Sequence, residues 1–149
     1  MADCKAMNRI NATLQNPLIA IVDDDASIRI STRRLVNVFG YGTETFSSAR
    51  EFLTASRSTD FACLILDLRM PGMDGLELQR LLSLQHRHTP QIIFVSARRS
   101  NDGLTEAMGT GAVEFLPKPV DAQALSIAIT KALRRDFYRE RKPWPVANA

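Results

Sequence analysis

Short runs of apolar residues alternate along the chain with segments of helical periodicity. The runs cover residues 18–22, 41–46, 61–66, 91–95 and 113–116, and each has the length of a β-strand. The run at 41–46 is the weakest of the five. Strands that are apolar on both faces are typical of a parallel sheet that helices cover on either side. The pattern therefore predicts five parallel strands.

Amphipathic segments separate and follow these runs. The first has a helical stripe at positions 28, 32, 35, 36 and 39, with Asp25 or Ser27 as its N-cap and Gly40 as its end. Residues 48–55, 76–84 and 104–108 form shorter crossover helices. The most regular helix begins at Asp121 as its N-cap and continues to about Arg135. The alternation predicts an α/β fold of the (βα)5 class, with a doubly wound parallel five-stranded sheet.

The 149 residues suffice for one domain with one core, which we expect at residues 17–136. Residues 1–16 are polar and rich in asparagine. Residues 137–149 hold Pro143 and Pro145 and show no apolar period. We therefore expect a flexible N-terminal extension and a flexible basic tail, or truncated linker, at the other end.

The net charge of +3 lies wholly in the last part of the chain. Residues 134–149 hold five basic and two acidic side chains, whereas residues 1–133 hold 14 of each. The domain has no net basic character, so we expect no direct nucleic-acid binding. The longest apolar run, at 61–66, is far shorter than the roughly 20 residues of a membrane span. The N-terminus lacks the apolar core of a secretory signal, and we expect a cytoplasmic protein with no membrane contact.

Polar residues stand where four of the five predicted strands end. They are Asp23, Asp24, Asp25, Asp67, Ser96 and Lys118. The carboxyl ends of parallel strands meet at one edge of a sheet, where open α/β sheets bind their ligands. Each residue alone has an ordinary explanation, such as a helix cap for Asp25 or solvated surface for Lys118. Their convergence at one edge favours a shared site.

A cluster of carboxylates is costly unless a cation or a proton neutralises it. Mg²⁺ prefers oxygen ligands and keeps waters that phosphate oxygens can replace. Asp67 is then a candidate nucleophile toward phosphorus, because a carboxylate can carry an acyl phosphate. Ser96 can donate a hydrogen bond to one phosphoryl oxygen, and Lys118 can neutralise another.

The sequence resembles the receiver domain of bacterial two-component response regulators over residues 17–136. Four motifs carry the resemblance, and they follow in order as Ile-Val-Asp-Asp-Asp at 21–25, Leu-Ile-Leu-Asp-Leu-Arg-Met-Pro-Gly-Met-Asp-Gly at 64–75, Ser-Ala at 96–97 and Phe-Leu-Pro-Lys-Pro at 115–119. The body of the sequence looks like the receivers of nitrogen-fixation and nitrate-response transcription regulators. The resemblance implies the flavodoxin-like strand order 2-1-3-4-5.

The resemblance also implies a role for each acidic residue. Asp67 would accept a phosphoryl group from a phosphohistidine of a sensor histidine kinase or phosphotransfer protein. Asp24, Asp67 and the backbone carbonyl of Arg69 would hold Mg²⁺, and Asp23 would act through a metal-bound water. Such a domain is a phospho-acceptor in signal transduction and not primarily an enzyme.

Ser96 and Lys118 would hold the phosphoryl oxygens in such a domain. In the family, the hydroxyl at the Ser96 position moves toward the phosphoryl group and the aromatic side chain at the Phe115 position turns inward. The face of the fourth helix, the fifth strand and the fifth helix then changes, for binding a downstream effector protein or for forming a homodimer. The Lys118-Pro119 bond resembles the family's cis X-Pro bond.

Two arginines depart from the commonest pattern of the family. Arg69 and Arg98 lie two positions after Asp67 and Ser96, beside the place where an attacking water must approach. We expect them to affect the lifetime of the phosphoryl group. The alternative is that both are ordinary solvated side chains.

Other interpretations stay open. Only 14 residues follow Arg135, too few for a DNA-binding unit, so we expect a stand-alone receiver or the receiver portion of a longer DNA-binding transcription regulator. The segment 23–27 also fits haloacid-dehalogenase-like phosphatases, with Asp23 as nucleophile and Asp25 as acid and base. A degenerate receiver that only binds partners is disfavoured, because no member of the acidic, hydroxyl and lysine set is missing.

Overall fold

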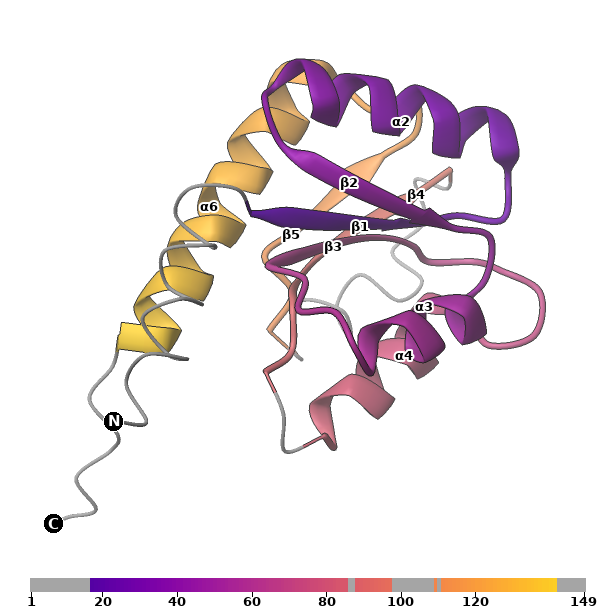
Figure 1. Ribbon diagram of the computed structural model, residues 1–149. Coiled ribbons are helices and arrows are strands. Elements are labelled where there is room, and N and C mark those ends of the chain that lie inside the picture. The colour runs from indigo at the N-terminus through magenta and orange to yellow at the C-terminus, as the bar shows by residue number, and fades with distance from the viewer. Residues whose placement is uncertain (1–16, 86–87, 98–108, 110, 142–149) are drawn as a thin grey trace, which may run out of the picture.

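A single parallel sheet forms the centre of the molecule (Figure 1). The computed structural model describes residues 17–85, 88–97, 109 and 111–141. The sheet has the order β2-β1-β3-β4-β5, and its strands are β1 (Leu18–Val22), β2 (Gly42–Phe46), β3 (Cys63–Asp67), β4 (Gln91–Ser96) and β5 (Glu114–Pro117). The predicted fold class and the strand order 2-1-3-4-5 are both confirmed.

Helices cover both faces of the sheet. The described helices are α2 (Ala26–Val38), α3 (Ala49–Ser56), α4 (Gly75–Ser83) and α6 (Ala122–Arg141). Figure 1 shows α2 and α6 on one face, with α3 and α4 on the other. Two apolar clusters result, one joining Ile65 of β3 to Val36 and Ile129, the other joining Leu66 of β3 to Phe52 of α3. Alternate residues of each central strand therefore serve opposite layers of the core.

Polar caps begin the helices near the carboxyl edge of the sheet. Asp25 caps α2, Ser48 caps α3 and Asp74 caps α4, each by accepting a hydrogen bond from a backbone N–H of the first turn. Asp121 accepts such a bond at the start of α6. The N-cap of α2 is therefore Asp25, and not Ser27, which was the other predicted cap.

The last helix is longer than the sequence pattern predicts. It continues to Arg141 instead of ending near Arg135, so the predicted end of this helix is wrong. The physical reason is that neither glycine nor proline interrupts the chain before Pro143. The predicted helix at 104–108 and the predicted flexible extension at 1–16 lie outside the described residues. Within the described part of the chain, no helix is long and apolar enough to span a membrane.

Candidate functional site

Three carboxylates meet at the carboxyl edge of the sheet. Val22 of β1 pairs with Leu66 of β3, so the residues that come next, Asp23 and Asp67, are brought side by side. Oxygen atoms of Asp23, Asp24 and Asp67 all lie within 4.8 Å of one another. Asp23 and Asp67 are only 4% and 6% exposed, whereas Asp24 is exposed to solvent. The cluster is thus buried at its base and open at one side.

Lys118 joins two of these carboxylates. Its Nζ lies 2.8 Å from Oδ2 of Asp23 and 3.4 Å from Oδ1 of Asp67. The backbone N–H of Lys118 donates a hydrogen bond of 2.8 Å to the carbonyl of Ser96, which ties the turn after β5 to the end of β4. The Lys118-Pro119 peptide bond is cis, as the resemblance implied. The structure therefore brings the predicted lysine into the acidic cluster.

Asp23 is held at four points. Its Oδ1 accepts a hydrogen bond of 2.9 Å from the N–H of Asp25, and its Oδ2 contacts Lys118. Its own N–H donates to the carbonyl of Phe46, and its carbonyl accepts a 2.7 Å hydrogen bond from Nη1 of Arg29. Because both carboxylate oxygens are engaged, this geometry does not favour Asp23 as the nucleophile of a phosphatase. The role of Arg29 was missed by the sequence analysis, where the only hint was a basic residue one turn into α2.

The charges of the cluster are out of balance. Burial, and after it the charge of Asp23, raises the pKa of Asp67 from the ordinary 3.8 to about 7, although the charge of Lys118 and the N–H of Arg69 oppose this rise. Burial lowers the pKa of Lys118, but its bond to Asp23 and the charge of Asp67 more than compensate, so the pKa of this ammonium is raised. One ammonium among three carboxylates leaves net negative charge. A set of oxygen donors with this charge suits a hard divalent cation.

Three of the remaining predicted residues, Ser96, Phe115 and Arg69, lie in the described part of the chain. Ser96 ends β4, is 2% exposed and comes directly after Val95, the register partner of Asp67. Phe115 is half-buried on β5, with its ring centroid 6.4 Å from that of Phe94. Arg69 is exposed, and its backbone N–H donates a 3.3 Å hydrogen bond to Oδ1 of Asp67. The other departing arginine, at position 98, lies outside the described residues.

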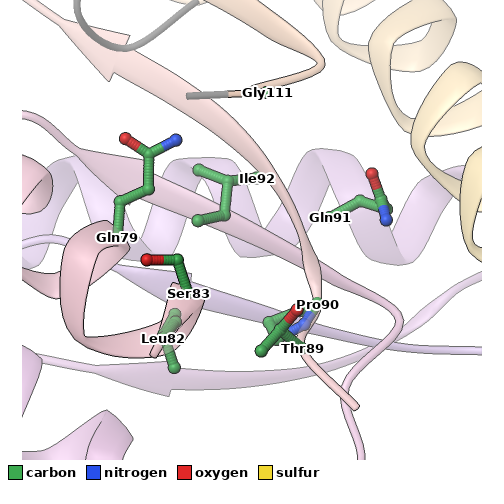
Figure 2. A pocket seen from close by; sticks show the side chains of 8 residues that line it. All are labelled: Gln79, Leu82, Ser83, Thr89, Pro90, Gln91, Ile92 and Gly111. Atoms are coloured by element: carbon green, nitrogen blue, oxygen red, sulfur yellow. The ribbon is translucent and has the colours of Figure 1, made fainter. Parts of the chain in front are cut away.

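A cavity in the described part of the molecule lies away from the acidic cluster. Figure 2 shows it beside the C-terminal half of α4, where it is lined by Gln79, Leu82, Ser83, Thr89, Pro90, Gln91, Ile92 and Gly111. Gln91 is the first residue of β4, so the cavity lies at the amino end of that strand, opposite the acidic cluster. Among the described residues, no charged residue lines this cavity, so the candidate functional site is the acidic cluster at the carboxyl edge of the sheet.

Comparisons with known proteins identify the family. Residues 19–130 match the family model described as response regulator receiver domain. The chain is 37% identical over 117 residues to the transcriptional regulatory protein FixJ of Bradyrhizobium diazoefficiens, covering 78% of this chain and 57% of FixJ. It is 37% identical over 131 residues to nodulation protein W of the same organism, covering 88% of this chain and 57% of that protein. The chain spans about half the length of the curated relatives it matches.

Solved structures agree with this match. The response regulator StyR superposes with a TM-score of 0.77 at 40% identity, covering 85% of this chain and 63% of StyR. A receiver domain protein from Clostridium thermocellum superposes with a TM-score of 0.75 at 30% identity, covering 83% of this chain and 98% of that one. The sheet order and the acidic edge fit such domains. The chain therefore belongs to the family of response regulator receiver domains, which are signalling domains that are typically phosphorylated on an aspartate.

Proposed function

We propose that this receiver is a Mg²⁺-dependent phosphoryl switch with Asp67 as its phospho-acceptor. The observation that carries the proposal is the position of Asp67: it ends β3, is almost fully buried, and shares Lys118 with Asp23. A carboxylate oxygen of Asp67 attacks the phosphorus of a phosphohistidine. The P–N bond breaks, and the imidazole of the donor leaves as the acyl phosphate forms.

We assign Mg²⁺ to the carboxylates of Asp24 and Asp67 and the carbonyl of Arg69, with Asp23 acting through a bound water. The short distances within the acidic cluster and its excess of negative charge support this assignment. When bound, the cation neutralises charge on the carboxylates and on the incoming phosphoryl group. Lys118, already inside the cluster, holds one phosphoryl oxygen by its charge.

The output of the switch is assigned to Ser96 and Phe115. The hydroxyl of Ser96 holds a second phosphoryl oxygen, and the ring of Phe115 turns inward when the hydroxyl moves. The half-buried position of Phe115 on β5, beside Phe94, supports this role because the ring has both a core side and a solvent side. The face that changes includes β5 and α6, and it binds a downstream effector protein or a second copy of the chain. The predicted helix at 104–108, which the resemblance adds to this face, lies outside the described residues.

The phosphoryl donor is assigned to a sensor histidine kinase or a phosphotransfer protein, and this chain is assigned to the cytoplasm. A second candidate for the whole protein follows from coverage, since the matches take up only 57% of FixJ and 57% of nodulation protein W, and FixJ is a transcriptional regulatory protein. In that case residues 17–136 are the receiver portion of a longer DNA-binding regulator, and the segment from residue 137 onward leads into its linker. This chain itself would then bind no nucleic acid.

The proposal is tested by intact-protein mass spectrometry after incubation with Mg²⁺ and acetyl phosphate. The native chain is expected to gain one phosphoryl group, and Asp67→Asn is expected to gain none. Glu44→Gln, which changes an exposed carboxylate on β2, is the matched control and should gain the group normally. Chelation of Mg²⁺ should abolish the gain. A phosphoryl group that Asp67→Asn still accepts, or no gain by the native chain with Mg²⁺ present, would contradict the proposal.

A further inference from the structure

Gly75, the first residue of α4, lies against the backbone of Asp67. A Cβ atom at position 75 would stand 2.5 Å from the carbonyl oxygen of Asp67, 3.1 Å from Cα of Leu68 and 3.2 Å from Cε1 of Phe94. The two nearest of these atoms belong to the main chain, which cannot turn aside as a flexible side chain can. Gly75 is not among the glycines with positive φ, so space and not backbone conformation requires a glycine here.

Hydrogen bonds hold this close approach from both sides. The N–H of Gly75 donates a 2.9 Å bond to the carbonyl of Leu68, whose own N–H donates a 3.1 Å bond to Val95 of β4. Asp74 fixes the start of the helix by accepting a 2.9 Å bond from the N–H of Glu77. The residue that follows Asp67 is therefore clamped between β4 and the first turn of α4. Neither element can retreat from a new side chain without breaking one of these bonds.

We propose that Gly75 is a positioning residue for phosphoryl transfer. Its missing side chain lets α4 rest directly on the Asp67–Leu68 peptide, and this contact sets the direction in which the Asp67 carboxylate leaves the sheet edge. The inference rests on the proposed role of Asp67 as phospho-acceptor. A side chain at position 75 displaces the backbone of Asp67 and so moves its carboxylate relative to Asp24 and Lys118. Transfer depends steeply on such alignment, because displacements of about 1 Å can cost about a hundredfold in rate.

Helix propensity alone predicts that alanine is favourable at position 75. Alanine favours a helix over glycine, so Gly75→Ala would stabilise α4 if only propensity mattered. Gly40, which lies between α2 and β2 at the amino edge of the sheet, provides a matched control. Its φ of +97° makes an alanine strained, but a Cβ there would meet nothing within 4 Å. Gly40→Ala therefore destabilises the fold without reaching Asp67.

The test compares the native chain, Gly75→Ala and Gly40→Ala at a temperature at which circular dichroism shows each to be folded. Three quantities are measured: amide NMR shifts of the metal-free protein, the Mg²⁺ dissociation constant by calorimetry, and the rate of phosphoryl gain from acetyl phosphate. Gly75→Ala should shift the amides of Asp67 and Leu68, raise the Mg²⁺ dissociation constant about tenfold and slow phosphorylation at least about tenfold. Gly40→Ala should melt at a lower temperature with Mg²⁺ binding and rate within about twofold of native.

Two results would overturn the inference. One is a Gly75→Ala variant with native Mg²⁺ affinity and rate, and the other is an equal loss in Gly40→Ala, which would make stability the cause. If the native chain takes up no phosphoryl group, the proposed function fails while the NMR and Mg²⁺ measurements still test Gly75. If the native chain is phosphorylated and Gly75→Ala equals it, only the inference on Gly75 fails.

A pair of cap variants serves if Gly75→Ala does not fold. Asp74→Ala removes the N-cap of α4 and loosens its contact with the Asp67–Leu68 peptide without adding atoms there. Ser48→Ala removes the matching cap of α3. Asp74→Ala should weaken Mg²⁺ binding several-fold, and Ser48→Ala should leave it native. Equal Mg²⁺ affinities in the two variants would contradict the inference.

Discussion

Both edges of the sheet bury a carboxylate beside a basic side chain, but the number of carboxylates for each basic group differs. At the carboxyl edge, the ammonium of Lys118 contacts Asp23 and Asp67, two of the three clustered aspartates. At the amino edge, Asp136 of α6 is 1% exposed and its Oδ1 lies 3.1 Å from Nε2 of His88, just before β4. Cys63, the first residue of β3, is buried nearby, and burial together with the charge of Asp136 raises the pKa of its thiol.

The comparison shows that burial of a charged residue does not by itself identify a functional site. At the amino edge, one carboxylate faces one imidazole, and this contact links α6 to the segment before β4. Three carboxylates and one ammonium at the carboxyl edge leave negative charge that either a proton on Asp67 or a further cation complements. The unbalanced charge and the exposed position of Asp24 distinguish the proposed ligand site from the contact at the amino edge.

The largest effect is expected from removing the ammonium of the carboxyl edge. Lys118→Met leaves Asp23 and Asp67 buried without a cation, which should lower the free energy of unfolding of the metal-free protein at pH 8 by about 3 kcal/mol. Phosphorylation by acetyl phosphate should be lost. Urea unfolding measures the first effect, and Mg²⁺ should restore part of the stability. Native stability in metal-free Lys118→Met would show that the lysine does not neutralise the cluster.

The pH dependence of stability should also separate the two edges. The pKa of Asp67 is 3.8 when unfolded and about 7 when folded, because burial and Asp23 raise it. Between these values the folded state keeps a proton that the unfolded state has released, so stability falls as pH rises from about 4 to about 7 and then levels off. Melting temperatures of the metal-free protein should show this fall, and Asp67→Asn should reduce it. Parallel pH curves for the two proteins would contradict the prediction.

The carboxyl edge was predictable from sequence because topology alone brings its residues together. Asp23, Asp67 and Ser96 stand at the ends of apolar runs, and parallel pairing aligns those ends whatever the side chains in between. Lys118 follows the last run after one proline, and the turn after β5 carries it inward. The sequence pattern does not predict how closely a helix packs against a particular peptide. The hydrogen bond from Arg29 to Asp23 and the close approach of Gly75 to Asp67 both depend on that distance.

The amino edge escaped the sequence analysis for a different reason. Asp136 lies four positions after Ala132 and seven after Ile129, so it continues the buried stripe of α6. The predicted helix ended near Arg135, so Asp136 was considered only in the net charge of residues 134–149. Its partner, His88, is 48 positions away in the sequence, and no motif marks it. A pair of this kind is visible only when the chain is folded.

A smaller effect is expected from breaking the pair at the amino edge. Asp136→Asn keeps an acceptor for His88 but removes the charge, and should lower the free energy of unfolding by about 1–2 kcal/mol. Because the pair lies at the opposite edge from the acidic cluster, the Mg²⁺ dissociation constant and the rate of phosphorylation should stay within about twofold of native. Urea unfolding and calorimetry on the same sample check both. A large change in Mg²⁺ affinity would mean that the two edges are coupled.

The smallest effect is expected where an acid and a base meet in solvent. Nζ of Lys131 on α6 lies 3.5 Å from Oε2 of Glu114 on β5, and the two side chains are 55% and 36% exposed. Water and salt screen such a pair, so Lys131→Met should change the free energy of unfolding by less than about 0.5 kcal/mol. Like Lys118→Met, this variant removes an ammonium. Lys131, however, is exposed and contacts one carboxylate at 3.5 Å, whereas Lys118 contacts two buried carboxylates at 2.8 and 3.4 Å. A loss as large as that of Lys118→Met would show that pairing itself, and not burial with unbalanced charge, sets the energetic cost at the carboxyl edge.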